Sequence, residues 1–149
     1  MNIIDALLGE HGALYVEMEQ LEQTLQESVA DAQALAAIVG GAIEAHSRLE
    51  DEVLFSVLAR RSAEAEGIIR SMQRMHEDIG DALRRLRALP GGVGARDLAL
   101  SAIALAREHF SAEEELCFPL ADQVLPAAVL SELGARWAER RGVTYVGAP

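Results

Sequence analysis

His109-Phe110-Ser111-Ala112-Glu113 is one of two similar stretches in the sequence, the other being His46-Ser47-Arg48-Leu49-Glu50. Each is a His-x-x-x-Glu, a spacing that places the imidazole and the carboxylate on the same face of a helix, one turn apart. The similarity continues after the glutamates, because residues 50–55 read Glu-Asp-Glu-Val-Leu-Phe and residues 113–118 read Glu-Glu-Glu-Leu-Cys-Phe. A repeat of this kind predicts two related halves whose histidines and glutamates meet in one site.

The composition favours a helical protein of one domain, because half of the 149 residues are hydrophobic and only 4% are aromatic. The net charge of −11 argues against nucleic acid and anionic membranes as partners, since both require basic surfaces. The longest apolar run, residues 34–43, is too short to cross a bilayer, and no secretory signal is evident. Cys117 is the single cysteine, which excludes an internal disulfide and fits a reducing compartment. We therefore expect a soluble, cytoplasmic protein.

Hydrophobic periodicity, helix caps and breakers predict four long helices and a shorter fifth. Ser28 and Ser62 are suited to begin a helix, and Leu89-Pro90-Gly91-Gly92 is a strong helix breaker. Ile38 and Leu116 are among the side chains expected to face the core. The helices span about 3–26, 28–60, 62–88, 95–115 and 127–140.

Long helices joined by short loops are antiparallel neighbours, so the sequence predicts an all-α, up-down-up-down four-helix bundle. We assign residues 1–120 to this bundle, and residues 121–149 to a short C-terminal helix and tail packed on the same domain. The predicted turns also place the histidines at one level. Two residues at equal height on antiparallel helices lie equally far from the turn between them.

The midpoints between successive histidines fall at the predicted turns. They lie beside Ser28, at Arg61-Ser62 and inside the Pro-Gly-Gly loop. Buried imidazoles and carboxylates need partners, and a bound metal supplies them. Imidazole nitrogen and carboxylate oxygen suit iron, manganese or zinc, and two pairs of histidines with two bridging glutamates indicate two ions rather than one. The candidate ligands are His11, His46, His76 and His109, with Glu50 and Glu113 as the bridges.

A ferritin-like di-iron site is excluded by spacing, because it uses Glu-x-x-His and no histidine here follows an acid by three residues. The pattern, with the following stretch Glu114-Glu115-Leu116-Cys117-Phe118-Pro119, instead resembles the hemerythrin-like (HHE cation-binding) domain over roughly residues 1–120. The resemblance implies two iron ions, as Fe2+ or Fe3+, joined by an oxo or hydroxo bridge. It also implies that the histidines are terminal ligands and that Glu50 and Glu113 are the bridges.

One position departs from the oxygen carriers of this family, which have a fifth histidine one turn before the position of His76. Met72 stands there, so the ion held by His76 and His109 is short of a ligand. Either Met72 stays apolar, or Glu77 or the phenol of Tyr15 reaches the ion. The open position favours chemistry with peroxide, or a looser iron-responsive site, over plain oxygen carriage.

Other side chains near the ligands are expected to have ordinary roles. Asp51-Glu52 and Glu114-Glu115 are predicted to be solvated helix faces rather than partners of the ligands. Tyr15 and Met72 are expected to pack in the core, with contact to the ligands as the alternative. Cys117 is expected to be a small buried hydrophobe rather than a redox switch.

Three classes of function are compatible with this site. The preferred class is a di-iron protein that binds dioxygen, peroxide or nitric oxide as a carrier, sensor or scavenger. The second is an enzyme at the same metals, with catalase-like decomposition of peroxide or an oxidase activity. The third is an iron-storage or iron-responsive regulatory module whose helices change order with metal occupancy.

Overall fold

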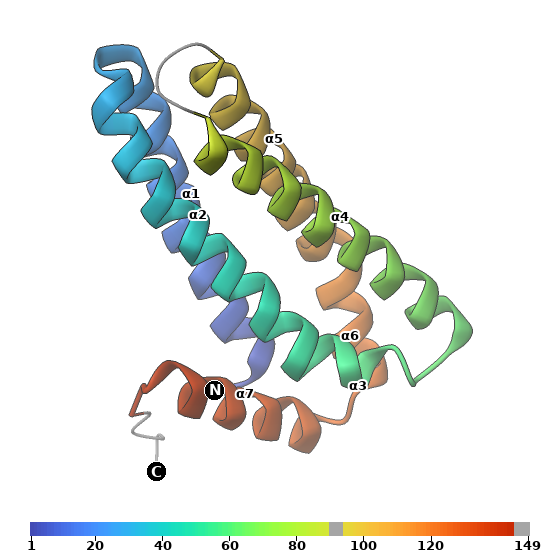
Figure 1. The fold of residues 1–149 in the computed structure, drawn as a ribbon. Helices are drawn as coiled ribbons and strands as arrows, with labels where there is room; N and C mark the ends of the chain where they lie inside the picture. Colours follow the sequence, from blue (N-terminus) through green and yellow to red (C-terminus); the bar gives the residue numbers. More distant parts are fainter. Residues whose placement is uncertain (90–93, 145–149) are drawn as a thin grey trace.

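Four long helices form an up-down bundle in the computed structural model, which describes residues 1–89 and 94–144 apart from the side chains of 29–31. α1 lies beside α2, and α4 lies beside α5 (Figure 1). No β-strand occurs among the described residues, which confirms the predicted all-α class. The long helices are α1 (Ile3–Glu27), α2 (Val29–Glu50), α4 (Ala63–Ala88) and α5 (Ala95–Ala112).

The two predicted turns that fall within the described residues lie where the sequence predicted them. Only Ser28 separates α1 from α2. The Ser62 side chain caps α4, because its hydroxyl accepts a hydrogen bond from the Ala65 N–H at 3.0 Å. The third predicted turn falls in residues 90–93, outside the described residues, between the end of α4 and the start of α5.

Two π-helical turns interrupt the bundle, and the sequence did not predict them. η1 (Asp51–Phe55) follows α2 and continues into α3 (Ser56–Leu58), while η2 (Glu113–Cys117) follows α5 and continues into α6 (Phe118–Val124). A π-helix bonds each residue to the fifth along the chain, so its side chains depart from the α-helical spacing. Leu116, predicted to face the core from α-helical spacing, is 54% exposed, and that prediction is wrong.

The predicted core of α2 also needs one correction. Ile38 was expected to face inward, but its side chain is 68% exposed, while Ala36 and Val39 on either side of it are buried. The buried face of α2 mixes small residues, such as Ala36 and Gly40, with Val39 and Ile43. Gly40 approaches the side chain of Leu83, since a Cβ on Gly40 would lie 3.0 Å from it.

The core consists of two apolar clusters at different heights of the bundle. One contains Leu14, Met18 and other residues toward the α1–α2 turn. The second contains Leu7 and Phe55 and lies toward the opposite end. His11 falls between Leu7 and Leu14 on α1, so the histidine level lies between the two clusters.

The shorter predicted helix is α7 (Ala127–Arg141), which runs across the end of the bundle where α1 begins (Figure 1). It fits closely there, because a Cβ on Gly134 would lie 2.5 Å from the backbone oxygen of Met1. The helix ends at Gly142, whose φ of 64° suits glycine. The division of the chain at residue 120 stays a prediction, and most of the predicted tail lies outside the described residues.

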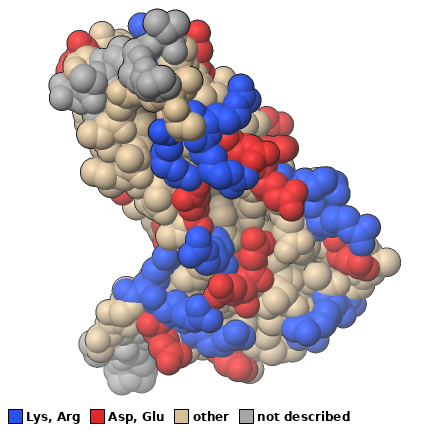
Figure 2. All heavy atoms as spheres, in the orientation of Figure 1, with Lys and Arg blue, Asp and Glu red and all other residues tan. Residues whose placement is uncertain are grey.

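No helix in the part of the chain that the structure describes combines the length and the apolar character needed to cross a membrane. Figure 2 shows basic and acidic side chains interspersed over the face that carries α2 and α4. The net negative charge of the chain therefore does not form one continuous acidic surface on this face.

Candidate metal centre

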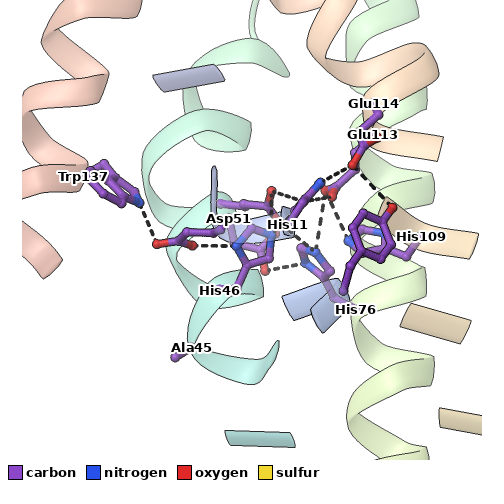
Figure 3. A network of polar contacts seen from close by, with 12 residues as sticks. His11, Ala45, His46, Asp51, His76, His109, Glu113, Glu114 and Trp137 are labelled. Atoms are coloured by element: carbon purple, nitrogen blue, oxygen red, sulfur yellow. Dashed lines mark hydrogen bonds and ion pairs between the residues drawn. The ribbon is translucent and has the colours of Figure 1, made fainter. Parts of the chain in front are cut away.

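Six buried or nearly buried side chains meet at the histidine level (Figure 3). Each long helix contributes one histidine, as the turn midpoints predicted, and the two glutamates enter from the end of α2 and the start of η2. The structure thus brings together the full set that the sequence singled out, and their role as ligands remains a prediction. The set is His11, His46, Glu50, His76, His109 and Glu113.

The six side chains form two overlapping groups of four. In each group, one ligand atom from each residue lies within 4.8 Å of those of the other three. Glu50 and Glu113 belong to both groups, while each group has its own pair of histidines. The first pair is His11 with His46, and the second is His76 with His109.

Seven polar atoms at the centre are buried and lack a hydrogen-bond partner among the described residues. Both carboxylate oxygens of Glu50 and both of Glu113 are buried without a hydrogen bond, although histidine nitrogens lie as close as 3.1 Å to Glu50 and 3.2 Å to Glu113. His76 Nε2 and both ring nitrogens of His109 are also buried without a hydrogen bond. A buried carboxylate without a partner is costly, so atoms of this kind indicate a bound group that the side chains surround. Nitrogen and oxygen donors converging in this way fit divalent cations.

Three of the histidines have a carboxylate at the ring nitrogen that faces away from the centre. An ionised carboxylate only accepts hydrogen bonds, so this nitrogen, Nδ1, must donate. Nε2 then keeps its lone pair for a cation, which is how carboxylate–histidine pairs orient metal ligands. The pairs are His11 with Glu114, His46 with Glu10 and His76 with Asp51, at nitrogen–oxygen distances of 2.8, 2.6 and 3.2 Å.

These contacts correct the prediction for the two acidic runs. Asp51 and Glu114 were expected to be solvated, but they contact His76 and His11. Asp51 is the first residue of η1 and Glu114 is the second of η2, so both lie where the helix departs from α-helical spacing. The signal was present in the sequence, since each acid directly follows a candidate bridging glutamate in both repeats.

Aromatic rings pack directly against the histidines. Phe110 stacks on His11, with ring centroids 4.3 Å apart and an interplanar angle of 21°. Phe55 stacks on His76 at 5.6 Å and 13°. Phe55 and Phe110 are fully buried, so they restrict the rotation of the imidazoles and keep water away from one side of each ring.

The structure places the four other side chains considered near the ligands differently. They are Tyr15, Met72, Cys117 and Glu77. The Tyr15 hydroxyl donates to Glu114 at 3.4 Å, and burial and the charge of Glu114 raise the pKa of the phenol. Met72 is buried in the apolar cluster with Phe55, so it stays apolar. Cys117 is buried in the same cluster, and burial raises the pKa of its thiol well above the usual range. Glu77 is exposed, and the structure does not bring it to the site.

Three groups of the centre, His46, His76 and Glu50, have pKa values that favour their charged forms. Burial by itself lowers the pKa of His46, but the charge of Glu50 and the hydrogen bond to Glu10 outweigh burial and raise it to about 10. Burial also lowers the pKa of His76, whereas its hydrogen bond to Asp51 and the charge of Glu50 raise it to about 9. Burial raises the pKa of Glu50, but the charge of His46 holds it well below its usual range. A cation must therefore displace protons from these imidazoles.

Sequence reasoning missed Glu10 and its partners on α7. The Glu10 carboxylate accepts hydrogen bonds from His46, from Trp137 Nε1 at 2.7 Å and from Arg141 Nε at 2.6 Å. Hydrogen bonds from His46 and Arg141 overcome the effect of burial and lower the pKa of Glu10 to about 2. The available signal was the Trp137–Arg141 spacing of one helical turn, which places both side chains on one face of α7.

Comparison with protein families gives one result. The family model described as the hemerythrin HHE cation binding domain matches residues 2–122. No curated protein and no solved structure matches the chain. The matched residues include all six side chains at the centre and stop before α7 begins at Ala127. Because the match covers most of the chain, the protein belongs to the hemerythrin HHE cation-binding domain family.

Proposed function

We propose that the chain holds two iron ions between its four histidines, and that this centre binds dioxygen or a related small ligand such as peroxide or nitric oxide. The sharing of Glu50 and Glu113 by both groups of donors supports the proposal most directly. Each carboxylate has two oxygens, and none of the four has a hydrogen-bond partner. Each glutamate can therefore serve two ions at once, as a bridge.

The donor set favours iron within this cation-binding family. Two histidines with carboxylates are typical of non-haem iron sites, whereas thiolate donors would point to zinc or an iron–sulfur cluster. Cys117 belongs to neither group of donors, and its raised pKa disfavours the thiolate. A pair of iron ions would supply or accept two electrons in reactions with small oxygen-containing molecules.

The surroundings of the centre suit a small ligand. A cavity of about 340 Å³ between α2 and α4 borders His76 and Asp51, and one of about 200 Å³ borders His46. His76 is the most exposed of the four histidines, at 7%. The stacked ring of Phe55 covers one face of the His76 imidazole.

Metal analysis of the purified protein tests this proposal. We expect about two irons per chain in the wild type, because two groups of donors share two bridges. His109→Ala should abolish the two-metal centre, since it removes one of two histidines from one group. Glu77→Ala is the matched control, because this exposed acid is close to His76 in sequence and lies away from the centre. Full iron occupancy in His109→Ala, or zinc alone in the wild type, would contradict the proposal.

The burial of Met72 favours a second candidate function, the decomposition of peroxide. Met72 packs among apolar side chains and its thioether has no nitrogen, so the ion at His76 and His109 has no third imidazole-type donor at this position. We expect the iron-loaded protein to evolve oxygen steadily from hydrogen peroxide. Met72→His should lower the rate about tenfold by adding a fifth histidine where oxygen carriers have one.

The matched control is Met75→His, which adds a histidine to the same helix at a partly buried position in the same cluster. It should leave the rate of oxygen evolution unchanged. An oxygen electrode measures the rates, with iron content determined for each variant. A wild-type protein that binds two irons and evolves no oxygen would exclude this candidate and favour carriage or sensing.

A further inference from the structure

The Glu10 carboxylate on α1 is fixed by four N–H groups. Its Oε2 accepts from His46 Nδ1 at 2.6 Å and from Arg141 Nη2 at 2.9 Å. Its Oε1 accepts from Arg141 Nε at 2.6 Å and from Trp137 Nε1 at 2.7 Å. Each oxygen has two donors, and the guanidinium binds in a bidentate manner, so the carboxylate has little freedom to turn.

The residues that fix Glu10 come from α7, beyond the part of the chain that matches the family model. Trp137 and Arg141 are one helical turn apart and share a face. Figure 3 shows Trp137 reaching from α7 toward the contact made by His46. Arg141 Nη2 also donates to the backbone oxygen of Ala45 at 3.4 Å, next to His46 in the chain. α7 thus contacts both helices that carry the first histidine pair.

Glu10 differs from the other two carboxylates that contact histidines. Asp51 and Glu114 directly follow the candidate bridges, and their side chains are 36% and 33% exposed. Glu10 is 16% exposed, and a separate helix holds it. Each of the other two has one weaker hydrogen bond from a further side chain, at 3.2 Å from Gln73 and 3.4 Å from Tyr15.

The hydrogen bond to Glu10 fixes the orientation and the tautomer of the His46 imidazole. Because the carboxylate accepts, Nδ1 carries the proton, and Nε2 points to the centre at 3.1 Å from Glu50 and 3.0 Å from His11 Nε2. Without its donors on α7, Glu10 could turn toward solvent and be hydrated. The His46 ring would then lose the group that fixes both its orientation and its tautomer.

We propose that Trp137 and Arg141 are positioning residues of the metal centre, which hold Glu10 so that it keeps the His46 imidazole directed at the cation. The inference rests on the proposed function, because it requires that His46 binds a cation. α7 then helps to position a metal ligand, in addition to covering the end of the bundle.

The test compares Fe2+ release from the wild-type chain, two variants and one control variant. Arg141→Gln and Trp137→Phe remove donors to Glu10 while keeping most of the side-chain volume. Arg140→Gln is the matched control, because Arg140 directly precedes Arg141 on α7 and pairs instead with Glu52 at 2.6 Å. We expect Arg141→Gln and Trp137→Phe to release Fe2+ about tenfold faster than the wild type, and Arg140→Gln to release it at the wild-type rate.

The absorption spectrum of the Co2+-loaded protein provides a readout that a merely structural role would not change. A displaced imidazole alters the field at the cation, so both variants should shift the visible bands, and the control should not. Lower melting temperatures of the metal-free variants, with unchanged Fe2+ release and unchanged Co2+ bands, would overturn the inference.

His46→Ala separates failure of this inference from failure of the proposed function. If His46→Ala loses Fe2+ while Arg141→Gln and Trp137→Phe release it at the wild-type rate, only the positioning role is overturned. If His46→Ala keeps the full Fe2+ content, the ligand assignment and the positioning role both fail.

Discussion

His109 differs from the other three histidines because its Nδ1 is buried and has no hydrogen-bond partner. The other three rings each donate to a carboxylate, and such partners hold the ring and make its nitrogen a better donor to a cation. For His109, the side chains around it must fix the ring, including Phe110, whose centroid lies 5.7 Å away. The carboxylate partners should therefore contribute measurably to metal affinity.

Asp51→Ala tests this contribution at one residue. Removing the partner of His76 should weaken binding of Fe2+ about tenfold, because loss of an outer hydrogen bond typically costs 10–100-fold in affinity. Glu52→Ala is the control, since the next residue is exposed and bonds to Arg140 on the surface. Titration of the metal-free proteins with Fe2+ measures both constants. Equal weakening by the two substitutions would indicate a general effect of negative charge instead.

The sequence identified the six side chains at the centre. Both arguments used, the spacing along a helix and the equal distance of successive histidines from the turn between them, depend only on residue numbers. It did not identify their carboxylate partners. Glu10 precedes His11 directly, and adjacent residues on an α-helix face different directions, so spacing did not connect it with the site. Its connection to His46 depends on how α1, α2 and α7 pack, which no local pattern records.

At the scale of elements, the helix starts and caps were predictable. The π turns were not, and the predicted end of the fourth helix near residue 115 is wrong, because the helical path continues through η2 and α6 to Val124. Ser62 caps α4 through its own hydroxyl, which is a local interaction. The π turns begin at Asp51 and Glu113 and shift later side chains away from the expected face, as the exposure of Leu116 shows. Ile38 was misplaced for another reason: α2 is rich in alanine, so its apolar residues define the buried face poorly.

Gly134→Ala tests the packing of α7 as an element. The added methyl group would lie 2.5 Å from the Met1 backbone oxygen, so α7 must shift, at a cost of about 1–3 kcal/mol of stability. Gly41→Ala is the matched control, because a Cβ there meets nothing within 4 Å and the position is exposed inside α2. It should stabilise the protein by about 0.5–1 kcal/mol. Urea unfolding measures both changes, and stabilisation by Gly134→Ala would contradict the close fit.

At the scale of the whole molecule, the polar centre lies between two apolar clusters. Each cluster joins side chains from several helices, so the bundle does not depend on the centre alone for cohesion. The centre itself contributes buried carboxylates and imidazoles, which favour the fold only when they are paired or bound. Metal should therefore raise stability without being required for folding.

Removal of the metal with a chelator tests this expectation. We expect most of the helical circular dichroism to remain at room temperature and the melting temperature to fall. A ligand that binds only the folded state stabilises it by about 2.7 kcal/mol at a concentration 100 times its dissociation constant. Loss of most of the helicity would contradict the two-cluster argument and would favour an iron-responsive module whose order depends on metal.

The metal-free protein should also lose stability as the pH rises. Its folded state raises the pKa of His46 to about 10 and that of His76 to about 9, above the ordinary value of 6.5. The folded state then binds protons that the unfolded state releases. The resulting contribution to the free energy of unfolding is full below about pH 6.5 and is lost as the pH rises through about 10.

Metal-loaded protein should show the opposite trend at low pH, where protons compete with the cation for the imidazoles. Melting temperatures between pH 6 and 10, measured with and without chelator, test both trends. A metal-free protein whose stability does not change across this range would show that the imidazolium–carboxylate pairs do not form.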